Sequence, residues 1–204
     1  MIALRRLFLA LGGFLAAASL LGAVPPRLEL EPSDPSLAGQ VLIASPAIGD
    51  PRFRRTVILL VTHSKNGALG IVINRPLGEQ SIAGLLELFG EKDRSAEGTV
   101  RIFAGGPVQP EICFVIHTAD SNWPETIPIN GVVAVTSNKE VVRGIGRHSG
   151  PRKTLVAFGY AGWGPGQLEG ELARNDWATA GADLDLIFDV TREQVWDEAM
   201  ARRP

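Results

Sequence analysis

The residue types that carry covalent or acid–base chemistry are few in this sequence. It contains one cysteine, Cys113, and three histidines, His63, His117 and His148. A thiol and an imidazole act together only when the base reaches the nucleophile. Cys113 and His117 fall on one face of a single predicted strand, about 13 Å apart along it, so they cannot pair. A pairing of Cys113 with His63 across two strands stays open geometrically, and it defines the hypothesis of a hydrolase or redox-linked enzyme.

Other signatures of catalysis are missing. No two histidines share with an acid the helical or hairpin spacing that a metal site needs. The chain has no Gly-x-Ser-x-Gly elbow and no acidic pair for which a raised pKa can be inferred. Cys113 lies in an apolar run, residues 112–116, which favours a buried and inert thiol. We therefore predict no catalytic residues, no metal and no cofactor.

Two glycine-rich segments indicate binding instead. Residues 159–167, Gly-Tyr-Ala-Gly-Trp-Gly-Pro-Gly-Gln, follow a predicted strand and open a predicted helix, where backbone amides can hold an anion. Their spacing matches no nucleotide fingerprint, and Glu169 and Glu171 oppose a phosphate, which favours a structural turn. Residues 105–110, Gly-Gly-Pro-Val-Gln-Pro, join two predicted strands, and their glycines permit positive φ or close backbone approach. If the two segments converge, they line a shallow groove for a peptide or small ligand.

A third candidate segment is Asn74-Arg75-Pro76, which ends a predicted strand. The planar guanidinium of Arg75 can bind a carboxylate of a partner, or it can form an internal ion pair with Asp50 or Glu79. The predicted binding residues from the three segments are Asn74, Arg75, Gly105, Gly106, Pro107, Gln109, Gly162, Trp163, Gly164, Gly166 and Gln167.

Charge disfavours nucleic acid as a partner. The sequence has 20 basic and 22 acidic residues, and removing the two arginines of residues 1–23 leaves 18 against 22, a formal net charge of −4. The only local basic run beyond that point is residues 52–55, Arg-Phe-Arg-Arg. Direct DNA binding would require these arginines and Arg75 to form a basic face.

The candidate segments must be positioned by a mixture of strands and helices. Apolar β-branched runs predict strands at residues 40–45, 56–62, 68–74, 100–104, 113–117, 132–135, 154–160 and 184–190. Helices are predicted at residues 81–88 and 165–175, and after capping boxes at residues 137–140 and 191–194. Strands come first and helices are interspersed later. This order predicts a single compact α+β domain with a mixed, largely antiparallel sheet and about four helices.

The N-terminus differs from the rest of the chain. Residues 1–23 have the pattern of a signal peptide or membrane anchor: two arginines, then an apolar stretch of 15 residues. Residues 24–36 are rich in proline and acid, which is typical of a linker, so we assign residues 37–204 to the folded domain. We expect an exported, periplasmic or membrane-anchored protein, touching a membrane only through residues 1–23. If the start site is misassigned, the protein is cytoplasmic.

Four segments resemble the bacterial AlgH/YqgE family. They are residues 42–46 with 50–53, residues 67–76 (Gly-Ala-Leu-Gly-Ile-Val-Ile-Asn-Arg-Pro), residues 105–110 and residues 159–169. The resemblance extends from Leu37 to the C-terminus. It implies a compact, usually cytoplasmic α+β protein with no established enzymatic activity and no agreed catalytic residues. Some members are described as transcriptional regulators of exopolysaccharide synthesis. Typical members begin near the position of Leu37, so residues 1–23 depart from the family.

These observations favour a non-enzymatic regulatory or accessory protein. We expect it to bind a protein partner or a small ligand through the glycine-rich segments and Trp163. The alternatives are a transcriptional regulator that binds DNA directly, and an enzyme that uses Cys113 or a histidine.

Overall fold

The computed structural model describes residues 36–93 and 95–203. The strands in this part of the chain are β1 (Gln40–Ala44), β2 (Val57–Ser64), β3 (Gly67–Val72), β4 (Pro76–Ser81), β5 (Thr99–Ala104), β6 (Val108–Thr118), β7 (Ile127–Pro128), β8 (Val133–Thr136), β9 (Thr154–Trp163) and β10 (Trp177–Gly181). The helices are α1 (Ile82–Leu88), α2 (Glu140–Gly146), α3 (Gln167–Ala173) and α4 (Val195–Ala201), with a 3-10 turn η1 (Pro51–Phe53) and a π-helical turn η2 (Asp185–Asp189).

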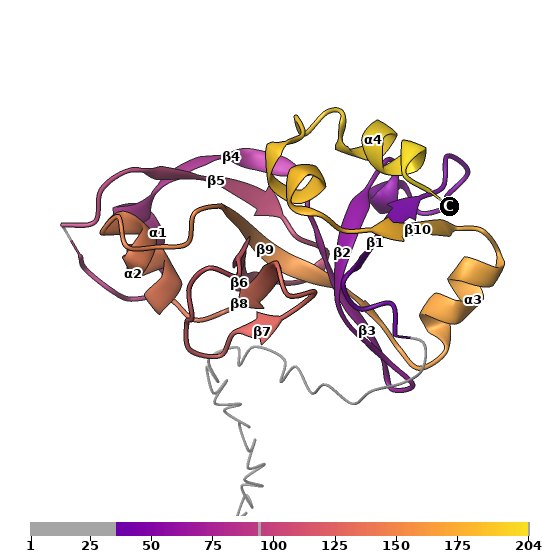
Figure 1. Cartoon of the computed structure of the whole chain (residues 1–204), viewed down its shortest axis with the longest axis horizontal. Coiled ribbons are helices and arrows are strands. Elements are labelled where there is room, and N and C mark those ends of the chain that lie inside the picture. Colours follow the sequence, from indigo (N-terminus) through magenta and orange to yellow (C-terminus); the bar gives the residue numbers. More distant parts are fainter. Residues whose placement is uncertain (1–35, 94, 204) are drawn as a thin grey trace, which may run out of the picture.

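The strands form one curled sheet (Figure 1). Its order is β10-β1-β2-β3-β9-β6-β8-β7, and β5 joins it by pairing with β9 and carries β4 at its other edge. The β5–β9 pairing is parallel, and the other described pairings are antiparallel. The prediction of a single α+β domain with a mixed, largely antiparallel sheet is confirmed.

Strand β9 holds the sheet together because it pairs with three other strands. Along one edge it pairs with β6. Along the other edge it pairs with β5 over residues 156–158 and then with β3 over residues 161–163. The partner therefore changes at Gly159 and Tyr160.

Glycines make this change of partner sterically feasible. Gly159 has a φ of +74°, and a Cβ atom there would lie 2.5 Å from the carbonyl oxygen of Gly106. A Cβ atom on Gly105 would lie 2.3 Å from the carbonyl oxygen of Gly159. The Gly105 amide donates to the Phe158 carbonyl at 2.7 Å, and its carbonyl accepts from the Val72 amide at 2.8 Å. The chain leaving β5 thus crosses between β3 and β9 where there is no room for a side chain.

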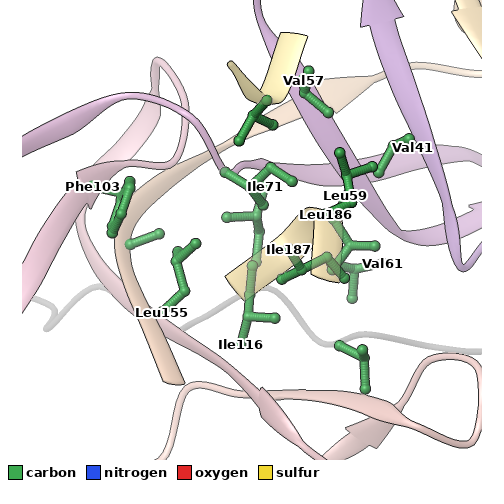
Figure 2. Packing of buried hydrophobic residues seen from close by; sticks show 14 of the residues in the cluster. Val41, Val57, Leu59, Val61, Ile71, Phe103, Ile116, Leu155, Leu186 and Ile187 are labelled. Atoms are coloured by element: carbon green, nitrogen blue, oxygen red, sulfur yellow. The ribbon is translucent and has the colours of Figure 1, made fainter. Parts of the chain in front are cut away.

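Both faces of most of the sheet are buried, whereas β4 is largely exposed. Val41 and Ile43 face the largest core cluster, which η2 and α4 cover, whereas Leu42 and Ala44 face the cluster beneath α3. Figure 2 shows Ile187 of η2 among the strand side chains of the largest cluster. Helices α1 and α2 cover a third cluster on β6 and β9. Because both faces are covered there, β1, β2 and β3 appear in the sequence as continuous apolar runs rather than as alternating ones.

The predicted strand at residues 184–190 is wrong, because these residues form the helical turn η2. Asp183 Oδ1 accepts a hydrogen bond from the Leu186 amide at 2.8 Å, and such a local bond favours a turn over a strand. Leu186 and Ile187 are adjacent and both fully buried. The strand of this region is β10, which pairs with β1 and was not predicted.

Both predicted capping boxes are also wrong. Lys139 is the N-cap of α2 and makes no side-chain cap, while Asn138 Oδ1 accepts from the Glu140 amide at 2.9 Å. At α4 the Thr191 hydroxyl donates to Gln194 Oε1 at 2.7 Å, so the two side chains bond each other rather than the helix amides.

The predicted leader, residues 1–23, and the linker at residues 24–36 lie outside the described residues, except for Ser36. Among the residues that the structure does describe, no helix is long and apolar enough to cross a membrane.

The crossing of glycines predicts a specific stability defect. Gly159→Ala combines a positive φ with a backbone clash, so we expect the free energy of unfolding in urea to fall by about 2–5 kcal/mol. Gly131→Ala is the matched control, because Gly131 has a φ of +80° but open space around its Cβ position. That substitution should cost only about 1 kcal/mol. Equal losses in the two variants would show that the crossing does not constrain the fold.

Candidate functional site

A pocket of about 390 Å³ lies where η1, the start of β6, the end of β9, α3 and β10 meet. In Figure 1, α3 lies at the edge of the molecule beside β3 and β10. The pocket lining includes three aromatic side chains, Phe53, Trp163 and Trp177, and four charged ones, Asp50, Arg52, Glu171 and Asp176. A concave site with aromatic walls and a few polar groups is the usual form of a ligand site.

The turn from β9 into α3 positions one wall of the pocket. Gly166 is the N-cap of α3 and adopts a left-handed conformation, with a φ of +72°. Gln167 Oε1 accepts a hydrogen bond from the Gly164 amide at 3.1 Å, which closes the turn. Glu171 follows Gln167 by four residues, so both side chains lie on one face of the helix.

The carboxylate of Glu171 is held by three neutral donors. Its Oε2 accepts hydrogen bonds from the indole Nε1 atoms of Trp163 and Trp177, each at 2.8 Å. Its Oε1 accepts from the amide Nε2 of Gln167 at 2.9 Å. A carboxylate offers about four acceptor positions, so about one is left. No cation of the described residues forms an ion pair with Glu171.

The aromatic rings pack edge to face. The ring centroids of Trp163 and Trp177 lie 6.1 Å apart, and those of Phe53 and Trp177 lie 5.5 Å apart. Trp163 and Trp177 are 7% and 4% exposed, so packing fixes them in place. The guanidinium of Arg52 lies 5.8 Å from the centre of the Phe53 ring. Such rings attract cations to their faces.

The other two acids of the pocket have cationic partners. Arg52 donates from Nε and Nη2 to Asp50 Oδ2, at 3.0 and 2.6 Å, and this guanidinium holds the pKa of the Asp50 carboxyl below its usual value. Asp176 pairs with Arg174 at 3.1 Å. Glu171 is therefore the lining carboxylate whose charge is compensated by neutral dipoles alone.

Four of the predicted binding residues line this pocket: Pro107, Gly162, Trp163 and Gln167. The two glycine-rich segments do converge, which is the geometry that the groove hypothesis requires. Trp163 is mostly buried and presents only part of its ring.

The other predicted binding residues of the two glycine-rich segments lie outside the pocket lining. Gly164 and Gly166 shape the turn into α3, and Gly105 and Gly106 pack against β9. Gln109 has a φ of +45° at the irregularity in the β6–β9 pairing.

Asn74 and Arg75 lie on the other side of η1. Asn74 Oδ1 accepts from the Val57 amide at 2.9 Å, and its Nδ2 donates to the Arg55 carbonyl at 2.9 Å. Arg75 donates to the Arg54 carbonyl at 2.6 Å. Among the described residues Arg75 forms no ion pair, so the expected pairing with Asp50 or Glu79 is wrong. Asp50 is already engaged by Arg52, which follows it by two residues.

Cys113 and His63 do not form a catalytic pair. Cys113 is 8% exposed within the cluster beneath α1 and α2, and burial raises the pKa of its thiol to about 12. Both ring nitrogens of His63 are engaged elsewhere. Its Nδ1 accepts from the Leu37 amide at 3.1 Å, so its Nε2 carries the proton that is shared with Glu169 Oε1 at 2.9 Å.

The other two histidines lie apart from the pocket lining. His117 is fully buried, its Nδ1 bonds the Thr118 carbonyl at 2.8 Å, and burial lowers the pKa of its imidazole. His148 is exposed, 3.9 Å from Glu97. Within residues 36–93 and 95–203, no three His, Cys, Asp or Glu side chains converge as metal ligands.

Ten of the fourteen lining residues were not predicted as binding residues from the sequence. Phe53, Glu171 and Trp177 were not chosen, although Gln167 and Glu171 share helical spacing directly after the Trp163 segment. Trp177 opens a strand that carries no apolar run, and only the sheet pairing of β10 with β1 brings it to the pocket.

The fold defines a class: single-domain α+β proteins built on one curled, largely antiparallel sheet. The AlgH-like family model matches residues 41–204. A UPF0301 protein of Thioalkalivibrio sulfidiphilus is 40% identical over 167 residues, which cover 82% of this chain and 89% of the relative. A UPF0301 protein of Rhodospirillum rubrum is 42% identical over 166 residues, 81% of this chain and 86% of the relative.

Two solved structures are similar in fold to this chain. The solution structure of the AlgH protein from Pseudomonas aeruginosa matches with a TM-score of 0.72 and 38% identity, covering 85% of this chain and 92% of that one. A crystal structure of a Corynebacterium diphtheriae protein matches with a TM-score of 0.64 at 21% identity, which shows the fold alone. The chain belongs to the AlgH-like family, as the sequence motifs predicted.

Removing the shared acceptor tests the architecture of the pocket. Glu171→Ala leaves two largely buried indole N–H groups without their acceptor, so we expect a loss of about 2–4 kcal/mol in the free energy of unfolding in urea. Glu87→Ala is the control, because Glu87 is also helical but exposed, and its loss should stay within about 0.5 kcal/mol. A Glu171→Ala variant as stable as the control would contradict the shared hydrogen bonds.

The buried thiol gives a second test. With its pKa near 12, Cys113 is almost entirely protonated at neutral pH. Native protein should react with a thiol-specific disulfide reagent at least about a thousand times more slowly than urea-unfolded protein. Reaction of the native protein at the rate of an exposed cysteine would contradict this burial and revive the enzyme hypothesis.

Proposed function

We propose that this protein is a non-enzymatic regulatory or accessory protein that acts by binding a ligand in the pocket between η1, β9, α3 and β10. The observation that supports this most is the Glu171 carboxylate, fixed by two indoles and an amide beside aromatic rings. Three neutral donors hold the charge in a defined position without cancelling it. That is the arrangement of a recognition group rather than of an ion pair that merely closes a surface.

The chemistry of the lining favours an organic cation. The pocket carries three carboxylates and one guanidinium, and the guanidinium is bound to Asp50. An amine or guanidinium group could pair with the Glu171 carboxylate and contact the π faces of Phe53 and Trp177. Apolar side chains of the lining, such as Ile48 and Val108, suit a hydrocarbon body on the same ligand. The ligand class is thus a protonated amine or guanidinium joined to an apolar group, either free or as a side chain of a peptide.

Binding accounts for these residues better than catalysis does. Turnover needs a nucleophile or a base that reaches the bound molecule. The Cys113 thiol lies within the core, and His63 is committed to Leu37 and Glu169. The pocket lining itself offers carboxylates, indoles and amides, which orient and select a ligand.

The four tryptophans provide a site-resolved test. In ¹H–¹⁵N spectra, titration with phenethylammonium or agmatine should shift the indole signals of Trp163 and Trp177 saturably and leave those of Trp123 and Trp196 in place. The uncharged isostere 2-phenylethanol and the anion 3-phenylpropionate should bind at least about fivefold more weakly, because neither can pair with the carboxylate.

Two variants distinguish the effect of the Glu171 charge on binding from the effect of its packing. Glu171→Gln keeps an oxygen acceptor for the indoles, and it should weaken binding of the cations about tenfold or more while the fold persists. Glu87→Gln should change nothing. Equal binding of the cation, the uncharged isostere and the anion would show that the pocket does not select an organic cation. Absence of any saturable shift at Trp163 and Trp177 with all probes would count against the pocket as a binding site.

A further inference from the structure

A second recess lies on the opposite side of η1. It measures about 370 Å³, and its lining contains the side chains of four arginines, Arg54, Arg55, Arg75 and Arg192, against one carboxylate, that of Glu193. Trp196 forms part of its wall. Its charge is therefore opposite to that of the aromatic pocket. The two recesses share the η1 region, whose Arg52 and Phe53 face one side and whose Pro51 and Arg54 face the other.

Only one of the four guanidinium groups has a carboxylate partner among the described residues. Arg55 pairs with Asp197 at 2.6 Å and lies 4.2 Å over the ring of Trp196. Arg75 donates to the Arg54 carbonyl at 2.6 Å and to Thr56 Oγ1 at 3.1 Å. Carbonyl and hydroxyl oxygens satisfy N–H donors, but they do not cancel a unit charge.

Arg192 is the most buried of the four, at 8% exposure. It donates to the Ile187 carbonyl at 2.8 Å and also to the carbonyls of Val190 and Ile73. These bonds tie η2 to the end of β3. The fold therefore keeps a positive charge in a largely buried position. Asp189 and Glu193 stabilise this charge from a distance, but among the described residues no carboxylate bonds it, so it is compensated only in part. An anion in the recess would compensate it.

Three of the four guanidinium groups are also fixed before any ligand arrives. Arg75 is held by η1, Arg192 by η2, and Arg55 by Trp196 and Asp197. Side chains that are already ordered lose little further entropy on binding. The planar N–H forks of arginine match the geometry of phosphate oxygens.

We infer that this recess is a binding site for a small polyvalent oxyanion, a phosphate or diphosphate group carried by a compact molecule. Three guanidinium charges without carboxylate partners call for more than one negative charge on the ligand. A recess is a better receptor for a compact group than for duplex DNA, which a flat or convex basic face would fit. The inference is independent of the organic cation proposed for the other pocket.

The experiment uses inorganic pyrophosphate as the probe at low, constant ionic strength, with calorimetry for affinity and ¹H–¹⁵N spectra for location. We expect saturable binding with one site per chain, a shift of the Trp196 indole signal, and unmoved signals of Trp163 and Trp177. Arg54→Gln should weaken binding about tenfold, because it removes one charge and Arg54 is exposed. Arg152→Gln is the control with the same change of charge, on an exposed arginine outside this lining, and it should bind as the unaltered protein does.

Further experiments distinguish a lipid headgroup from a free phosphate compound as the source of the phosphate group. Vesicles of phosphatidylcholine with phosphatidylglycerol, compared with phosphatidylcholine alone, test a lipid headgroup. Competition between these vesicles and pyrophosphate would assign the headgroup as the source, and lack of vesicle binding would assign a free phosphate compound. Three outcomes would overturn the inference: no saturable binding of pyrophosphate, equal binding by the Arg54→Gln and Arg152→Gln variants, or binding of duplex DNA without binding of pyrophosphate.

Discussion

The backbone of Gly159 touches the backbone of Gly105 and Gly106, and the rest of the architecture depends on that contact. It allows the segment after β5 to cross between β3 and β9, so that β9 can pair with β5 and then with β3 along one edge. Beyond the crossing, β9 continues to Trp163 and turns into α3. The same crossing delivers Pro107 and Val108 to the rim of the aromatic pocket. The close backbone packing at Gly159 thus positions two walls of the aromatic pocket, where we propose that the ligand binds.

The turn η1 has a comparable role between the two recesses. Asp50 caps it and pairs with Arg52 on the side of the aromatic pocket, while Arg75 binds its carbonyls from the other side. The arginines that the sequence presents as one basic run are therefore divided between two environments. Arg52 is neutralised by Asp50, two residues before it, whereas Arg54 and Arg55 line the second recess. The run therefore lies on two recesses rather than on one continuous face.

Much of the fold could be predicted from the sequence, because the apolar runs at residues 40–45 and 56–62 are long and bounded by turn residues. An apolar run also led us to predict a strand at residues 184–190, but there the Asp183 side chain bonds the Leu186 amide and starts a helical turn. Strand β10 was not predicted, because its residues form no apolar run and become a strand only by pairing with β1.

The candidate site was predicted to a similar extent and for similar reasons. Glycine-rich segments flanking strands indicate where a chain turns closely, and so Pro107, Gly162, Trp163 and Gln167 were found. Phe53 and Trp177 reach the pocket through sheet pairing and side-chain packing across more than a hundred residues of sequence, for which local patterns hold no signal. Arg75 was interpreted as an ion-pairing group because its type allows it, but in the fold it bonds carbonyl oxygens.

We propose that the Glu171 pocket selects a cationic ligand. Equilibrium dialysis of the protein against a small-molecule extract of bacterial cells, followed by mass spectrometry of the retained compounds, tests it without assuming which ligand is involved. We expect the unaltered protein to retain one or more amine or guanidinium compounds, and the equally folded Glu171→Gln variant to retain them at least about tenfold less. Retention of the same compounds by both proteins, or of anionic compounds alone, would contradict it.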